Sequence, residues 1–161
     1  MKQDLAIKLK MSELIYDIQN KTYLTGRSVD NGNNSAHVAN MQANDDDENS
    51  AQILRSITTA ASVLRNRLAE YIEAEELSSS NDILSATEDL TFNLRMPSNF
   101  NGAVAQTLGE VAHQFIVASA VADWFAITAK GETADYTGQA EASLGVIEEA
   151  LCKRVRPTRP K

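Results

Sequence analysis

Residues 103–129 are the longest apolar stretch of the chain, and they constrain its fold more than any other segment. The stretch contains no proline, which favours one long uninterrupted helix. A helix with apolar side chains on nearly all sides lies at the centre of a protein or in a contact between subunits. The large apolar residues spread around this helix are Val104, Leu108, Val111, Phe115, Ile116, Val121, Trp124, Phe125 and Ile127.

A second helix is predicted close behind it, over about residues 133–155, with one apolar face. Only residues 130–132 separate the two segments, and so short a link makes two helices antiparallel neighbours. The apolar face of the second helix contains Tyr136, Ala140, Leu144, Ile147 and Leu151.

Two more helices are predicted in the first half of the chain. One covers about residues 12–24, with Ser12 as its N-cap and Gly26 at its end. The other covers about residues 47–75 and follows the acidic run Asp45 to Glu48. Negative charge favours a helix start, so that run is interpreted as the helix beginning rather than as a calcium loop. The polar segment between them, residues 27–49, is expected to be a loop.

The clearest strand signal lies in residues 90–96, where Leu90, Phe92, Leu94 and Met96 alternate with polar residues. A β-hairpin over about residues 82–96 is expected, because Ile83 and Leu84 offer a weak partner strand. Residues 5–11 also alternate and are expected to join it as a strand, although they fit a helix continuing into residues 12–24 as well. The predicted fold is mainly α: a four-helix bundle-like domain with a small inserted β-hairpin and an extended C-terminal tail.

A chain of 161 residues fits one domain, here predicted as residues 1–152 with the hairpin inserted at about 82–97. The 43% of hydrophobic residues and 23% of charged residues are ordinary for a globular protein. The single cysteine, Cys152, is interpreted as a small core or interface residue. The beginning of the sequence does not resemble a signal peptide, and no run of some 18–20 consecutive apolar residues predicts a membrane span.

The charge of the chain is unevenly distributed. Residues 153–161 carry +5 and residues 1–152 carry −12, which gives the formal net charge of −7. An acidic body repels nucleic acid, whereas a basic arm seeks an acidic surface. Two prolines stiffen the arm and lower the cost of ordering it on a partner. The arm is predicted to bind a partner without contributing to the core, through Lys153, Arg154, Arg156, Pro157, Arg159, Pro160 and Lys161.

No pattern of residues predicts an enzyme, a metal site or a cofactor site. Glu110 and His113 have the E-x-x-H spacing of di-iron bundles, but the only other histidine, His37, lies in the predicted loop. His113 is therefore interpreted as a partly buried or interfacial residue. The sequence contains no phosphate-binding glycine motif, no nucleophile elbow and no C-x-x-C pair.

Three segments together resemble the adaptor proteins of tailed phages, which are also called head–tail connectors or head-completion proteins. They are Leu94-x-Met96-Pro97-x-Asn99-Phe100, the stretch from His113 to Trp124-Phe125, and Arg156-Pro157-x-Arg159-Pro160. The sequence is also similar to proteins encoded among virion genes of phages and prophages of gut bacteria. The resemblance implies a small helical subunit with an inserted hairpin or loop and a reaching terminus.

The resemblance further implies a ring, commonly twelve-fold, beneath the portal of the virion, in a protein made in the bacterial cytoplasm. Arg154, Arg156 and Arg159 are expected to dock on an acidic surface of the portal. DNA is expected to pass through the channel without specific binding, since an acidic ring repels it.

Other functions fit the same sequence. A tail-completion or tail-terminator protein of the same neck is one, although terminators tend to contain more strand. A cytosolic helical regulatory protein that binds a partner helix or a small ligand is another, and a metal enzyme built on Glu110 and His113 is a third.

Overall fold

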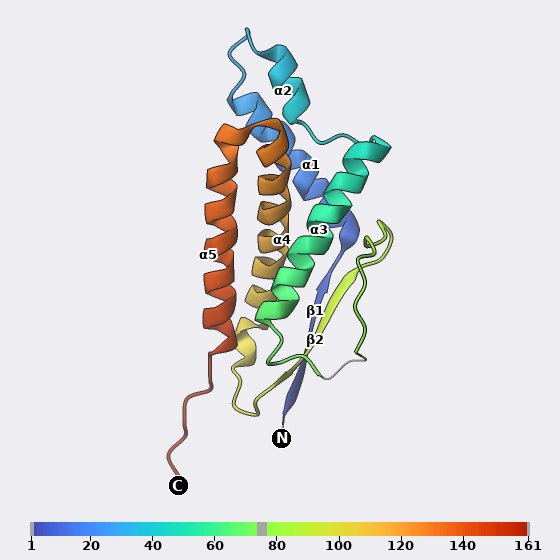
Figure 1. Cartoon of the computed structure of the whole chain (residues 1–161). Helices are drawn as coiled ribbons and strands as arrows, with labels where there is room; N and C mark the ends of the chain where they lie inside the picture. The colour runs from blue at the N-terminus through green and yellow to red at the C-terminus, as the bar shows by residue number, and fades with distance from the viewer. Residues whose placement is uncertain (1, 74–76, 161) are drawn as a thin grey trace.

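The computed structural model describes residues 2–73 and 77–160. The protein is mainly helical and has one small two-stranded antiparallel sheet (Figure 1). In chain order the elements are β1 (Gln3–Leu9), α1 (Met11–Ser28), α2 (Ser35–Met41), α3 (Asp47–Arg67), β2 (Leu90–Met96), the 3-10 turn η1 (Gly102–Val104), α4 (Ala105–Thr128), the 3-10 turn η2 (Lys130–Glu132) and α5 (Thr133–Leu151).

Helix α4 is the centre of the protein, as its apolar composition predicts. It contacts α5, α3, α1 and β1, and it buries residues on several sides. Helices α4 and α5 lie side by side and antiparallel, joined by η2, as the short link predicts (Figure 1). By length and composition residues Gly102–Thr128 could also cross a membrane, but 56% of that window is buried inside the protein. Burial in a protein core accounts for such a composition.

The strand partners differ from the predicted hairpin. β2 pairs with β1 from the beginning of the chain, in a register that runs from Gln3 opposite Met96 to Leu9 opposite Leu90. Residues 82–89 form no strand, so the hairpin over about 82–97 is wrong, whereas a strand over much of 5–11 is confirmed. The pairing places the apolar residues of both strands on one face against the helices. The buried ones are Ile7, Leu9, Leu90, Phe92, Leu94 and Met96.

The start of α1 is fixed by a residue far away in the sequence. The amide of Met11 donates a hydrogen bond to Oδ1 of Asp89, at 3.1 Å. Ser12 lies inside the helix and is not the N-cap that the sequence predicts. Asp89 immediately precedes β2, so one carboxylate ties the beginning of the second strand to the beginning of α1.

The predicted loop of residues 27–49 contains the short helix α2. Trp124 donates from its indole Nε1 to the carbonyl of Met41, at 2.7 Å, and this bond is buried. Gly26 does not end α1; it lies inside the helix and lets α2 approach. A Cβ atom at Gly26 would lie only 3.4 Å from the carbonyl oxygen of Val38.

Helix α3 begins beside the acidic run, as predicted, but ends at Arg67 and not near residue 75. The chain then turns and covers the outer edge of β2. The amide of Arg95 donates to the carbonyl of Tyr71, at 2.7 Å, and Ile72 forms an isolated bridge with Leu94. One edge of the sheet is thereby closed by the same chain.

Candidate functional site

The basic arm begins as a fixed part of the body. The amide of Asn101 donates to the carbonyl of Lys153, at 3.1 Å, and the amide of Val155 donates to the carbonyl of Asn99, at 2.8 Å. Arg154 and Phe100 form the isolated antiparallel bridge between these two bonds. Residues 153–155, here called the arm root, are therefore held by main-chain pairing with residues 99–101.

The side chains of the root are also engaged with the body. Arg154 donates from Nη1 to the carbonyl of Leu151, at 2.8 Å, and to that of Lys153, at 3.0 Å. A cation that binds the last carbonyls of a helix stabilises its C-terminus. Lys153 lies 3.1 Å from Glu149, one helical turn earlier, in an exposed pair. Two of the seven predicted partner-binding residues thus also contact the body, although none of residues 153–155 is buried. That the arm binds a partner stays a prediction.

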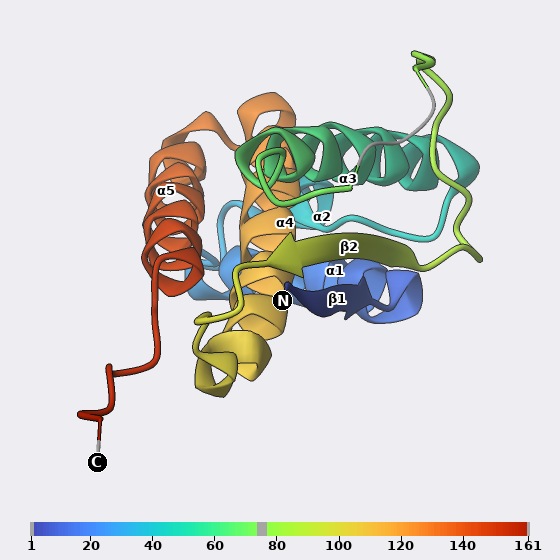
Figure 2. The same ribbon diagram turned by 90° about the horizontal axis from the view of Figure 1, so that it is seen from below.

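Residues 156–160 form what we call the free arm. All five are exposed, and none forms a hydrogen bond or ion pair with the described part of the chain. The free arm leads away from the body in both views (Figure 1, Figure 2). It contains four of the predicted residues, Arg156, Pro157, Arg159 and Pro160, and the last predicted residue, Lys161, lies outside the described residues.

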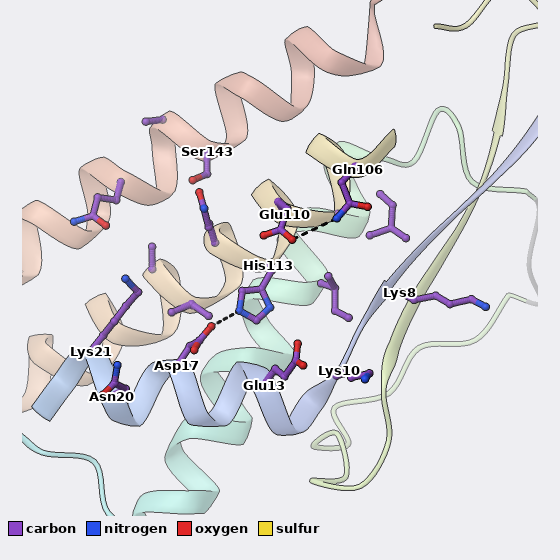
Figure 3. A pocket seen from close by; sticks show the side chains of 18 of the residues that line it. Lys8, Lys10, Glu13, Asp17, Asn20, Lys21, Gln106, Glu110, His113 and Ser143 are labelled. Atoms are coloured by element: carbon purple, nitrogen blue, oxygen red, sulfur yellow. Dashed lines mark hydrogen bonds and ion pairs between the residues drawn. The ribbon is translucent and has the colours of Figure 1, made fainter. Parts of the chain in front are cut away.

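A polar groove of about 1090 Å³ lies on another part of the surface, between β1, α1, α4 and α5 (Figure 3). The sequence did not predict it, because it forms only where one strand and three helices far apart in the chain meet. Among the residues that line it are Lys8, Lys10, Glu13, Asp17, Asn20, Lys21, Gln106, Glu110, His113 and Ser143.

Among the described residues that line this groove, His113 and Asp17 form the only ion pair. Nε2 of His113 lies 2.6 Å from Oδ2 of Asp17, and the two side chains are 19% and 40% exposed (Figure 3). The pair joins α4 to α1. The interpretation of His113 as a partly buried residue is confirmed.

The hydrogen-bond partner of Glu110 is an amide side chain, whereas a metal site requires further histidine, cysteine or carboxylate ligands beside it. Glu110 accepts a hydrogen bond from Nε2 of Gln106, at 3.4 Å, one turn earlier on α4. His37 lies on α2, outside the groove. Within residues 2–73 and 77–160, no three His, Cys, Asp or Glu side chains gather in a way that could hold a metal ion.

Cys152 is exposed and lies just after α5, so of its two interpretations the core residue is wrong and the interface residue stays a prediction. Burial raises the pKa of Asp123, and a hydrogen bond with Ser56 on α3 partly offsets this. Asp123 belongs to the contact between α4 and α3 and lies in neither the groove nor the arm.

No protein-family profile, curated protein or solved structure matches this chain.

Proposed function

We propose that the chain is the subunit of a homo-oligomeric ring that joins the capsid to the tail of a phage, as a head–tail connector. Its body would be a helical bundle that forms the ring wall. Its arm would bind a neighbouring chain, and the portal is the partner that the resemblance implies. The protein would then be part of the virion neck and be made in the bacterial cytoplasm.

The observation that carries the proposal is the construction of the arm. Its root is fixed by main-chain pairing, so the direction in which the free arm leaves the body is set in advance. Two prolines restrict the free arm to extended conformations, which lowers the entropy lost on binding. A segment that is prepared to bind in this way, and contacts nothing on its own body, is typical of a subunit that reaches for another chain.

Charge supports the same proposal. Residues 1–155 carry −10 and residues 156–161 carry +3. Copies of so acidic a body repel one another at long range, so contact between chains needs a local attraction. The free arm supplies positive charge that follows the last acidic side chain of the sequence, Glu149, by seven or more residues. An acidic wall would also repel the DNA that passes through the channel.

The test is co-expression with a phage portal protein, followed by light scattering and electron microscopy. We expect ring-shaped particles, or movement of this chain onto the portal. The double variant Arg156→Glu with Arg159→Glu should abolish that docking while thermal unfolding stays unchanged. Lys130→Glu is a control for reversing one positive charge elsewhere on the surface, because Lys130 is an exposed cation in η2, outside both the arm and the groove.

Two outcomes would contradict the proposal. A small monodisperse particle with and without the portal would favour the cytosolic regulatory protein. Docking that is unaffected by the double variant would remove the arm from the mechanism.

A further inference from the structure

The sheet has one edge that the described chain leaves open. The amide of Arg95 points to Tyr71 and away from β1. In an antiparallel pair, the amide and carbonyl of the opposite residue, Asp4, therefore also point away from the partner strand β2. Two-residue alternation then makes the amides and carbonyls of Ala6 and Lys8 point outward too. No hydrogen bond joins these outward groups to the described part of the chain.

This open edge lies along the polar groove. Five consecutive residues of the β1 segment, 6–10, line it, and α4 and α5 form the opposite side (Figure 3). An unpaired strand edge is a template for one more strand, and a groove beside it provides room for the side chains of that strand.

We infer that the groove beside β1 binds the free arm of a second copy of this chain, as an added antiparallel strand. The lengths agree. Residues 156–160 lie beyond the last bond that anchors the arm, and five residues line the groove along β1. At about 3.3 Å per residue, each segment spans roughly 17 Å when extended.

The spacing of the prolines fits an edge strand in one register. If Arg156 and Thr158 direct their amides towards β1, Pro157 and Arg159 direct theirs to the outer side. Proline is tolerated where its nitrogen faces away from the sheet, so Pro157 does not interrupt the pairing. Pro160 falls where an amide would again face β1, and it ends the strand.

The same register distributes the side chains of the arm over two faces. It places Arg156 opposite Lys8 on the exposed face, where water and salt screen the repulsion between the two cations. In an antiparallel pair, opposite residues project side chains to the same face. Arg156 and Thr158 would share the solvent face with Ala6 and Lys8, whose side chains are exposed. Pro157 and Arg159 would face the groove, where Glu13 and Glu110 are exposed carboxylates with no ion pair to the described residues.

The arm reaches a second copy and not its own groove, because the root directs it away from the body (Figure 1, Figure 2). The inference rests on the proposed assembly and changes one part of it. The arm would be bound by the next subunit, and the portal would be contacted by another surface.

The first test is a titration of the full-length protein with a peptide that matches residues 155–160, followed by amide NMR. We expect saturable binding with shifts of the Ala6 and Lys8 amides. N-methylation of the Thr158 amide should weaken binding about tenfold, the worth of roughly one hydrogen bond. N-methylation of the Arg159 amide should leave the affinity unchanged. Equal effects of the two methyl groups, no saturation at millimolar peptide, or shifts elsewhere would overturn the inference.

The second test fills the groove. Gly109 lines it, and a Cβ atom there would meet nothing within 4 Å. Gly109→Phe should therefore fold normally and lose peptide binding. Gly145→Phe is the matched control, because Gly145 is an equally open position on α5 that does not line the groove. Peptide binding that persists in Gly109→Phe would refute the site.

The two proposals can fail separately. If the protein forms rings on the portal but does not bind the peptide, only the proposal that the groove binds the arm is overturned. If the peptide binds the portal and not this chain, the partner of the arm is the portal and not a second copy. Peptide that binds the groove of a chain that never meets the portal would overturn the connector function alone.

Discussion

Two deletions that differ by three residues separate the arm root from the free arm. Removal of residues 156–161 takes away no hydrogen bond among the described residues. Removal of residues 153–161 takes away the two main-chain bonds to residues 99–101 and the Arg154 cap on α5. It also removes Arg154, the bridge partner of Phe100, so we expect Phe100, which is only 3% exposed in the intact protein, to become partly exposed.

The expected difference follows from these contacts. Each main-chain bond contributes about 1 kcal/mol net. The cation at the C-terminus of α5 contributes roughly 0.3–1 kcal/mol, and partial exposure of a phenylalanine costs on the order of 1 kcal/mol. The longer deletion should lower the free energy of unfolding by about 3 kcal/mol. For a chain of this size, that lowers Tm by about 6–12 °C.

Thermal and urea unfolding, followed by circular dichroism, measure both deletions against the full chain. The shorter deletion should change the free energy of unfolding by less than about 0.5 kcal/mol, as expected for a change at the exposed surface. Arg154→Ala removes only the side-chain cap and should lower the free energy of unfolding by less than about 1 kcal/mol. If both deletions unfold at the same temperature, main-chain pairing does not hold the root and the direction of the arm is not set by the body.

Three further substitutions test the body. Thr22→Val should lower the free energy of unfolding by about 1–3 kcal/mol, because the buried Thr22 hydroxyl accepts a hydrogen bond from the Ala43 amide at 3.1 Å and valine leaves that amide unpaired. Thr22→Ser retains the hydroxyl, so its free energy of unfolding should fall less in the same urea titration. Asp89→Ala should cost about 0.5–2 kcal/mol by removing the cap of α1 at Met11, and amide exchange should show the first turn of α1 opening first. Gly138→Ala should raise Tm, since the position is helical and open and alanine gains about 0.8–1 kcal/mol in a helix interior.

The sequence predicted those features that local patterns encode. Residues 103–129 are apolar on all sides, and α4 is indeed the central helix. The alternation in residues 90–96 marks β2 to the residue. The sequence predicted that residues 5–11 join the sheet, but it placed residues 82–84 beside β2 as well. The direct pairing of β1 with β2 is set by a shared apolar face across some 80 residues, and no local signal in either strand identifies the other.

Short elements and main-chain contacts were the features that the sequence predicted least well. Helix α2 has only seven residues and one buried side chain, Met41, so it shows no apolar period. The arm root was missed for a different reason. Its pairing with residues 99–101 uses amides and carbonyls, which every residue except proline offers in the same form. The groove combines both difficulties, because its walls come from four elements and one of them is a main-chain edge.

The inferred contact also limits how copies can assemble. The arm and the groove are different surfaces, so each contact is heterologous unless two copies exchange arms reciprocally. Heterologous contacts generate rings when the rotation closes and filaments when it does not. Within each copy the two surfaces are connected through one sheet: the arm root pairs with the residues that follow β2, and the groove runs along β1, the partner of β2. In the proposed assembly, the angle between an incoming and an outgoing arm would therefore be set by this short paired segment, as closure of a ring of defined size requires.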